Sequence, residues 1–309
     1  MTDILITGGA GLLGSALCFE MIRNYKVICC YHSDRIEIKD KNFSSLKIDI
    51  TKGSLREIEK ASPDIIIHTA ALTGLEFCEK NPELAHDVNV KGTENVLKVA
   101  KKCGAKLVYV CTDYIFNGKK GSYSEIDKSN PLSVYAKTKL LGEETVKKNY
   151  DNFLSTRTSL HGWNPNPLKS SLSSSIILSL RRKERFFAID QISSLMFAND
   201  FADVLIEMLE FNLTGIYNVA SSDSMSKYDF SLAVADVFNL DINSLEIVSL
   251  NDFMKKFSLI AKRPQNVSLT VSKIEAALGK RMPTILEGLL SMKEKEHKFK
   301  EAVRWRNAG

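Results

Sequence analysis

The strongest constraint in this 309-residue sequence is a run of glycines directly behind its first apolar segment. Ile4-Leu5-Ile6-Thr7 is short and rich in β-branched residues, as expected of a buried parallel strand. Gly8-Gly9-Ala10-Gly11-Leu12-Leu13-Gly14 follows at once, and a helical pattern runs from about Leu12 to Asn24. A Gly-x-x-Gly-x-x-Gly turn between a strand and a helix lets the backbone approach a pyrophosphate. We therefore expect a dinucleotide-binding loop, with cofactor contacts from Gly8, Gly11, Leu12, Leu13 and Gly14.

Apolar strand patterns and helical patterns alternate through the first half of the chain. The expected strands after the first cover residues 26–31, 46–50, 64–69, 107–110 and 153–158. The expected helices include residues 82–103 and 133–148, and a later helix at 200–211 is followed by a strand at 215–220. This alternation predicts an α/β fold with a doubly wound parallel sheet of the Rossmann type.

The end of the second expected strand bears on the choice of cofactor. An acid at this position binds the ribose 2′-hydroxyl of NAD, whereas a nearby cation accommodates the 2′-phosphate of NADP. The strand ends in Tyr31-His32-Ser33-Asp34-Arg35, so no acid stands directly at its tip, although Asp34 is close. His32, Ser33 and Arg35 can hold a phosphate, while Arg35 is equally well an ordinary solvated charge. We predict NADP(H), with NAD as the alternative.

Two later strand ends complete the expected cofactor site. Asp49 and Ile50 close the third strand, where Asp49 is placed to touch the adenine edge. Ala70 and Ala71 follow the fourth strand, and their small side chains let the chain pass beside the cofactor.

A second informative stretch runs from Cys111 to Lys139. A strand delivers the Thr112 hydroxyl at its end, and a helix capped by Ser133 presents Tyr135 and Lys139 one turn apart on one face. A nearby ammonium favours the phenolate, so Lys139 is expected to lower the pKa of Tyr135 towards the working range. A Tyr-x-x-x-Lys pair occurs by chance in a lysine-rich chain. Its position behind Thr112 and downstream of the glycine loop favours proton transfer to a carbinol oxygen.

The length of the chain and the order of its elements predict two domains. Residues 1–160, with elements returning at about 197–220, are expected to form the NADP(H)-binding domain, and residues 161–196 and 221–309 a smaller C-terminal α/β substrate lobe.

The net charge of +5 is scattered along the sequence, so we expect no nucleic-acid partner. Six cysteines without metal-ligand spacing predict reduced thiols and no metal site. Because no signal pattern or long apolar run is present, we expect a cytoplasmic protein without membrane insertion.

These motifs together resemble the extended short-chain dehydrogenases/reductases, and more narrowly the dTDP-4-dehydrorhamnose reductase family. Cys111-Thr112-Asp113-Tyr114-Ile115-Phe116-Asn117-Gly118 is similar to the family segment Ser-Thr-Asp-Tyr-Val-Phe-x-Gly. Pro131-Leu132-Ser133-Val134-Tyr135 through Gly142-Glu143 resembles the catalytic helix. Gly215–Ala220, Ser226–Phe230 and Arg263-Pro264-Gln265-Asn266-Val267-Ser268-Leu269 are similar to later family segments, so the resemblance covers nearly the whole chain.

The resemblance implies a reductase acting on a nucleotide-linked 4-keto-6-deoxy sugar. NADPH or NADH would be the hydride donor, and the implied reaction converts dTDP-4-dehydro-L-rhamnose to dTDP-L-rhamnose for surface polysaccharide precursors. The implied catalytic residues are Thr112, Tyr135 and Lys139, of which Tyr135 and Lys139 also contact the cofactor. The expected substrate contacts are Thr73, Asp113, Trp163 and Arg263. A homodimer is compatible with the sequence but is not required by it.

Departures from the family pattern leave the sugar and the activity open. Ser194-Leu195-Met196 and the altered segment Arg157–Trp163 both fall where the resemblance brings the chain to the substrate. Dehydration is disfavoured because Tyr114 stands where dehydratases carry the glutamate of an acid pair, while epimerisation stays open. The family also includes a regulatory subunit of methionine adenosyltransferase, and an intact site can persist in such a binding protein.

Overall fold

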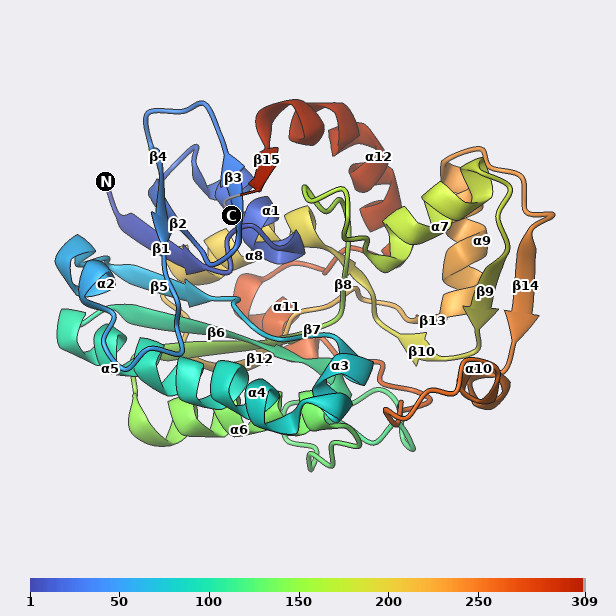
Figure 1. Ribbon diagram of the computed structural model, residues 1–309, viewed down its shortest axis with the longest axis horizontal. Helices are drawn as coiled ribbons and strands as arrows, with labels where there is room; N and C mark the ends of the chain where they lie inside the picture. Colours follow the sequence, from blue (N-terminus) through green and yellow to red (C-terminus); the bar gives the residue numbers. More distant parts are fainter. Residues whose placement is uncertain (308–309) are drawn as a thin grey trace.

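The computed structural model describes residues 1–307, which are built around a parallel sheet of seven strands (Figure 1). All neighbouring pairs in this sheet are parallel. The strands, in their order across the sheet, are β12 Gly215–Asn218, β7 Phe153–Thr158, β6 Lys106–Thr112, β5 Ile65–His68, β1 Asp3–Thr7, β2 Lys26–Tyr31 and β4 Phe43–Lys47. The strand order reverses between β1 and β5, and ligands bind at the carboxyl ends of strands beside such a reversal.

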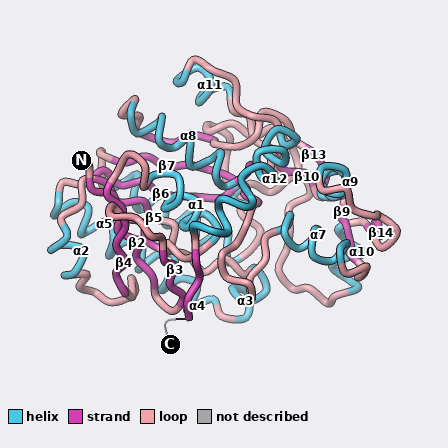
Figure 2. The backbone as a smooth tube through the Cα atoms, turned by 90° about the horizontal axis from the view of Figure 1, so that it is seen from above, coloured by secondary structure: helices cyan, strands magenta, loops and turns pink. Residues whose placement is uncertain are grey.

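Apolar, β-branched strands form the core because helices cover both faces of the sheet. The central residues of β1 and β6 are fully buried. Helices α1 and α8 pack on one face, while α5 and α6 pack on the other; Figure 2 shows α1 and α8 crossing over the strands. The helices of this part of the chain are α1 Leu12–Met21, α2 Arg56–Ala61, α3 Leu75–Lys80, α4 Pro82–His86, α5 Gly92–Cys103, α6 Val134–Asn149 and α8 Ala198–Glu210. A π-helical turn, Asp87–Lys91, joins α4 to α5, and a 3₁₀ turn, Asp113–Ile115, follows β6.

Smaller elements gather beside the carboxyl ends of the sheet, on the right of Figure 1. They include three two-stranded pairs: β9 with β14, β10 with β13, and β8 with β11. Their bounds are α7 Leu172–Arg181, β8 Leu160–His161, β9 Phe186–Ile189, β10 Ile192–Ser193, β11 Met196–Phe197, β13 Met225–Ser226, α9 Lys227–Val237, β14 Leu245–Val248 and α10 Leu250–Lys256. Two further helices also contact the large sheet or its helices: α11 Ser272–Leu278 packs against β12, and α12 Ile285–Ala302 packs against α8, α9 and β11. The domain boundaries expected from the sequence stay a prediction.

Several expected elements differ from those observed. The third strand covers residues 43–47 rather than 46–50, so Asp49 and Ile50 lie in the turn behind it. Helix α1 ends at Met21, because Asn24 and Tyr25 both donate their backbone N–H to the Met21 carbonyl and form a turn there. The mixed charges of residues 293–300 are typical of a solvated helix end, but these residues belong to α12, and Phe299 is buried with its ring 5.5 Å from that of Phe19.

The C-terminal strand returns to the first half of the chain. Strand β15, Arg304–Asn307, pairs antiparallel with β3, Asp34–Glu37, which lies directly behind β2. Figure 1 shows this strand, in red, beside the blue N-terminal strands. No sequence pattern had indicated either strand.

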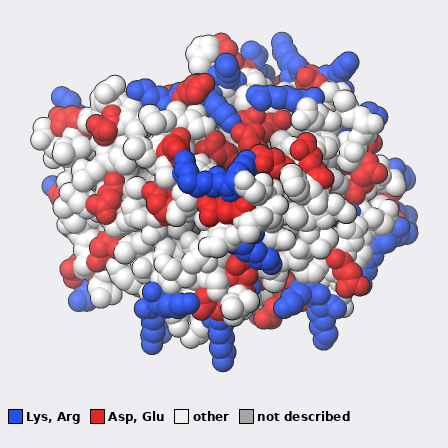
Figure 3. Space-filling view, turned by 180° about the vertical axis from the view of Figure 1, so that it is seen from behind, with Lys and Arg blue, Asp and Glu red and all other residues white. Residues whose placement is uncertain are grey.

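General properties of the described chain agree with the sequence. All six cysteines are free, and five of them are buried. On the face shown in Figure 3, basic side chains are interspersed with acidic ones, as the scattered charges had indicated. Within residues 1–307, no helix combines the length and the apolar character that crossing a bilayer requires.

Candidate active site

The glycine loop has the geometry that close backbone approach requires. Gly8 adopts a φ of +68°, and a Cβ on it would lie 2.7 Å from the backbone nitrogen of Ala70. A Cβ on Gly14 would clash with the carbonyl oxygen of Gly8. The Gly11 N–H donates to that same carbonyl over 3.0 Å, which closes the turn. The loop therefore holds β1, the Ala70 segment and α1 in close contact, as the first and third glycines of a dinucleotide loop do.

The N-terminus of α1 is suited to an anion. Gly11 occupies the N-cap position and supplies no side-chain cap, and the first turn, all of it described, contains no acidic side chain. The first intrahelical bond runs from the Ser15 N–H to the Gly11 carbonyl, so the preceding N–H groups of Leu12, Leu13 and Gly14 stay available. Because such N–H groups and the helix dipole attract phosphate, the loop fits the pyrophosphate of a dinucleotide.

The residues expected at the adenosine end are placed at the ends of β2, β4 and β5. His32 and Ser33 are exposed between β2 and β3, while Arg35 donates to Glu37 over 2.9 Å. Asp49 accepts hydrogen bonds from the backbone N–H and the hydroxyl of Thr51. These hydrogen bonds lower the pKa of Asp49, although burial acts in the opposite direction. Three small or apolar residues complete this edge: buried Ile50 and half-buried Ala70 and Ala71.

Strand β6 and helix α6 bring the expected catalytic residues together. Thr112 ends β6, and its hydroxyl donates to Asp113 Oδ1 over 3.1 Å while accepting the Tyr114 N–H. Ser133 caps α6 by accepting the Ala136 N–H, as the sequence predicted. The Thr112 side chain contacts the phenol of Tyr135, which lies one helical turn before Lys139.

Tyr135 has a raised pKa, which corrects the expectation that Lys139 would lower it. Burial disfavours the charged phenolate and raises the pKa of Tyr135 above its usual value, although the contact with Thr112 acts in the opposite direction. At neutral pH the phenol is therefore protonated. A protonated phenol is the state in which a tyrosine can donate a proton to an oxygen that gains negative charge.

Lys139 is anchored against Tyr109 of β6. Its backbone carbonyl accepts the Tyr109 hydroxyl over 2.9 Å, and its ammonium lies 4.3 Å from the centroid of the Tyr109 ring. Burial lowers the pKa of Lys139 to about 8. The side chain thus remains mainly protonated at neutral pH and is fixed by a cation–π contact.

Asp113 is buried beside the same group of side chains. Its Oδ2 atom has no hydrogen-bond partner among the described residues, although Thr112 donates to its Oδ1 atom. Burial raises the pKa of Asp113 to about 7, despite the opposing effect of the Thr112 hydrogen bond. Because this carboxyl adjoins Tyr135, it can take or give a hydrogen bond to a polar ligand there.

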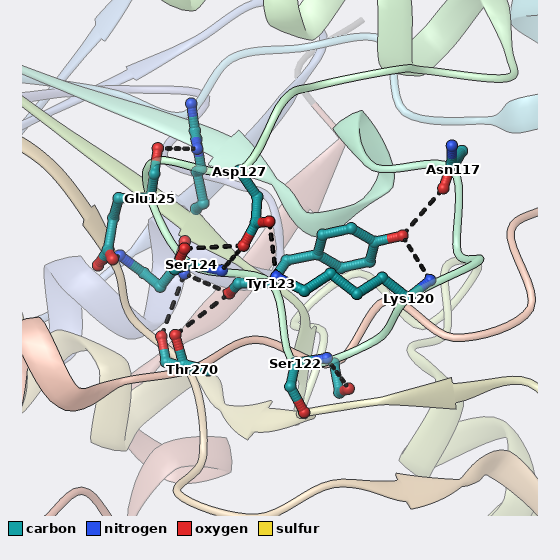
Figure 4. Close-up of polar contacts among 11 residues, drawn as sticks. Asn117, Lys120, Ser122, Tyr123, Ser124, Glu125, Asp127 and Thr270 are labelled. Carbon is teal, nitrogen blue, oxygen red and sulfur yellow. Dashed lines mark hydrogen bonds and ion pairs between the residues drawn. The ribbon is translucent and has the colours of Figure 1, made fainter.

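The loop between β6 and α6 is held in place by its own polar contacts (Figure 4). Tyr123 donates its hydroxyl to Asn117 and receives the Lys120 N–H on the same oxygen, while its ring stacks on Phe116 with centroids 4.2 Å apart. Asp127 accepts from the backbone and hydroxyl of Ser124 over 2.7 Å. This loop therefore fixes the distance between the strand of Thr112 and the helix of Tyr135.

Asn89 is a positioning residue that sequence reasoning missed. From the π-helical turn, its side-chain amide donates to the Leu72 carbonyl over 3.0 Å and to Thr138 Oγ1 over 2.9 Å. Its Oδ1 atom accepts the Leu72 N–H over 2.8 Å. It thus ties the segment behind β5 to the helix of Tyr135. The available signal was an asparagine on the apolar face of the expected helix at 82–103.

The structure places the expected substrate residues in different environments. Thr73 is exposed in the loop behind β5. Arg263 lies with its Nη2 atom 3.4 Å from Glu76 Oε1, and its Nε atom is buried without a partner among residues 1–307. The structure does not bring Trp163 to the site. Its indole is buried in the core, where it donates to the Met292 carbonyl over 3.1 Å and packs edge-on against Phe238.

Gln191, three residues before the altered segment Ser194-Leu195-Met196, connects two parts of this region. Gln191 is buried, accepts the Tyr114 hydroxyl over 3.0 Å and donates to the Pro264 carbonyl over 2.5 Å. It thereby connects the segment of Asp113 with that of Arg263. No group of three or more His, Cys, Asp or Glu side chains in the described chain is placed to hold a metal ion.

Comparison with known proteins agrees with this geometry. Methionine adenosyltransferase 2 subunit beta from Xenopus laevis is 31% identical over 288 residues, which cover 90% of this chain and 84% of that protein. The dTDP-4-dehydrorhamnose reductase of Aggregatibacter actinomycetemcomitans is 29% identical over 289 residues, which cover 90% of this chain and 94% of that protein.

A solved structure extends the comparison to the fold. The dTDP-4-dehydrorhamnose reductase of Bacillus anthracis, in complex with NADP, superposes with a TM-score of 0.80 at 26% identity, covering 96% of this chain and 100% of that one. A family model described as RmlD substrate binding domain matches residues 1–297. The chain therefore belongs to the RmlD substrate binding domain family, within the extended short-chain dehydrogenases/reductases.

Proposed function

We propose that this protein is an NADPH-dependent reductase of a nucleotide-linked 4-keto-6-deoxy sugar. The observation that carries the proposal is the joint placement of Thr112, Tyr135 and Lys139 at the carboxyl edge of a sheet whose first loop fits a pyrophosphate. The relative from Bacillus anthracis, whose structure contains NADP, supports the choice of cofactor. The reductase from Aggregatibacter actinomycetemcomitans supports dTDP-4-dehydro-L-rhamnose as the first substrate to test.

The residues of the site can perform the proton transfer that accompanies hydride transfer in such a reduction. When bound, NADPH supplies the hydride that a ketone carbon needs. Tyr135, protonated because burial raises its pKa, donates its proton to the ketone oxygen. Thr112 orients that oxygen through its hydroxyl, and the Lys139 ammonium offsets the negative charge left on the phenolate. Gly8, Gly14 and the N-terminus of α1 hold the pyrophosphate.

The nucleoside diphosphate of the substrate, which stays attached to the sugar during the reduction, also needs binding groups. A sugar diphosphate requires cations, and the planar fork of an arginine can bond two of its oxygens. Arg263 supports this role because its Nε atom is buried without a partner among the described residues. Its long contact with Glu76 leaves the guanidinium free to exchange partners on binding.

The test is NADPH oxidation against a matched panel of dTDP-, UDP- and GDP-linked 4-keto-6-deoxy sugars. Turnover of dTDP-4-dehydro-L-rhamnose supports the full proposal. Turnover of only a UDP- or GDP-linked sugar keeps the reductase and replaces the substrate. Absence of NADPH oxidation across the panel by folded, NADPH-binding protein contradicts the proposal.

A second candidate function is that of a regulatory subunit. The relative named methionine adenosyltransferase 2 subunit beta matches with an identity as high as that of the reductase. Co-purification with a methionine adenosyltransferase catalytic subunit, measured together with the sugar panel, separates the two functions. Binding without any sugar reduction would favour the regulatory subunit.

A further inference from the structure

The C-terminal strand β15 lies beside the expected binding position of the adenosine of a dinucleotide. In the β3–β15 pair, Asn307 stands opposite Asp34 and Arg304 opposite Glu37. Strand β3 follows β2 after only two residues, so the pair lies at the carboxyl end of β2. This is the strand end at which dinucleotide folds discriminate between a ribose 2′-hydroxyl and a 2′-phosphate.

Asp34 is contacted there by two segments distant in sequence. Lys169, from the loop before α7, places its Nζ atom 2.7 Å from Asp34 Oδ2. Trp305, from β15, donates its indole N–H to Asp34 Oδ1 over 3.3 Å. Burial alone would raise the pKa of Asp34, but these contacts, with a further one from Asn166, outweigh it and the pKa lies below its usual value. Both oxygens of an ionised carboxylate are therefore engaged within the protein.

The surrounding charges favour a phosphate over a hydroxyl. Glu37 is shared by two arginines: Arg35 Nη2 lies 2.9 Å from its Oε1 atom, and Arg306 Nε lies 3.3 Å from its Oε2 atom. With Lys169, three cations face two acids at this strand end. An unpaired carboxylate at Asp34, about twenty residues beyond the glycine loop, would instead bind a 2′-hydroxyl and repel a 2′-phosphate.

We infer that Lys169 and Trp305 hold Asp34 in a latch that selects NADPH over NADH. This inference rests on the proposed function, because it assumes that a dinucleotide occupies the glycine loop. The latch makes the acid near the end of β2 compatible with a 2′-phosphate by keeping it paired. The C-terminal strand thereby contributes to cofactor choice, although it lies outside the glycine loop.

The test is the ratio of the NADPH and NADH dissociation constants, measured by fluorescence titration without any sugar. Lys169→Met exposes the Asp34 carboxylate and should reduce the preference for NADPH by about tenfold or more. Asp34→Asn in the Lys169→Met background removes the exposed charge and should restore at least half of that loss on a logarithmic scale. Trp305→Phe keeps a ring in place but loses the N–H, so it should shift the ratio in the same direction by less.

The matched control is Lys102→Met, which removes an exposed lysine of α5 that pairs with Glu59 of α2. Its ratio should equal that of the wild type. Thermal unfolding checks that each variant folds, which is expected of Lys169→Met because 62% of the Lys169 side chain is exposed.

Each outcome has a distinct meaning. An unchanged ratio in Lys169→Met overturns the latch and leaves the reductase intact. A wild type that prefers NADH overturns the latch and also the choice of NADPH as hydride donor, but not the reduction itself. A loss that Asp34→Asn does not restore also overturns it, because the effect then does not pass through that carboxylate. An unchanged ratio in Trp305→Phe overturns the part assigned to the C-terminal strand. If the folded wild type binds neither dinucleotide, the latch and the proposed function fail together.

Discussion

Glu143 and Arg157 form a buried ion pair beneath the candidate active site, with Arg157 Nη2 2.7 Å from Glu143 Oε2. The Nε atom of Arg157 also donates to this carboxylate over 3.1 Å, and Ser155 donates to its other oxygen over 2.7 Å. Glu143 lies on α6, the helix of Tyr135, whereas Arg157 lies on β7. The pair therefore fixes the catalytic helix to the sheet.

Glu143→Ala should strongly destabilise the protein, because it leaves the buried Arg157 guanidinium without its counter-charge. We expect the free energy of unfolding to fall by about 3–5 kcal/mol. Denaturant unfolding followed by circular dichroism measures this change. Glu59→Ala, which removes the partner of exposed Lys102, is the control and should cost about 1 kcal/mol or less. Equal losses in the two variants would show that the buried pair is not what fixes α6.

Tyr135→Phe should abolish turnover while sparing cofactor binding, because it removes a single hydroxyl from the site. Losing the proton donor should lower kcat by about 10²–10⁴. Steady-state kinetics and an NADPH titration of the same preparation measure the two properties. Tyr150→Phe, which removes the hydroxyl that donates to the Ala105 carbonyl, serves as a control for losing a phenol elsewhere. A near-normal kcat in Tyr135→Phe would remove Tyr135 from the mechanism.

Asp113→Asn should change how stability depends on pH. The native state keeps the Asp113 proton up to pH about 7, whereas the unfolded chain loses it near the ordinary value of 3.8. Between these values the native state binds more protons, so this group makes stability fall as pH rises from about 4 to 7. Relative to Asp113→Asn, the wild type should lose on the order of 4 kcal/mol across that interval and change no further above it.

The measurement is denaturant unfolding of both proteins at a series of pH values, and only their difference matters. Titration of the buried histidines His68 and His161 affects both proteins alike and cancels in the difference. A difference that stays constant from pH 4 to 8 would mean that Asp113 is ionised in the native protein throughout.

Arg263→Ala should raise KM for the sugar nucleotide with NADPH held saturating. Losing one charge-assisted contact of roughly 1.5–3 kcal/mol corresponds to an increase of about ten- to a hundredfold. Arg185→Ala, which removes an exposed arginine paired with Glu246, is the matched control and should leave KM unchanged. If KM stays the same in Arg263→Ala, Arg263 binds Glu76 and not the substrate.

Local patterns predicted much of this molecule. Strands β2 and β7 have the predicted bounds, and α6 begins at the predicted Ser133 cap, because short apolar runs and a capping hydroxyl act within a few residues. The turn that brings Gly8 close to Ala70 follows from the absence of a Cβ, which is visible in the sequence.

The features that were not predicted depend on partners far away in the chain. In the sequence, a tryptophan is equally compatible with the core and with a binding cleft. Only the contact with Met292 in the folded chain shows that Trp163 lies in the core. The pairing of β15 with β3 joins residues 304–307 to residues 34–37. The raised pKa of Tyr135 depends on how deeply the folded chain buries the phenol, which the spacing to Lys139 does not reveal.

The most direct test of the proposed reduction follows the hydrogen itself. Wild-type protein is incubated with dTDP-4-dehydro-L-rhamnose and NADPH that carries deuterium at the transferring C4 position of the nicotinamide, and the product is analysed by mass spectrometry and NMR. The account predicts one deuterium at C4 of the reduced sugar, with labelled product forming about 10²–10⁴ times more slowly in Tyr135→Phe. A folded wild type that binds NADPH but transfers deuterium to none of the dTDP-, UDP- or GDP-linked 4-keto sugars would contradict it.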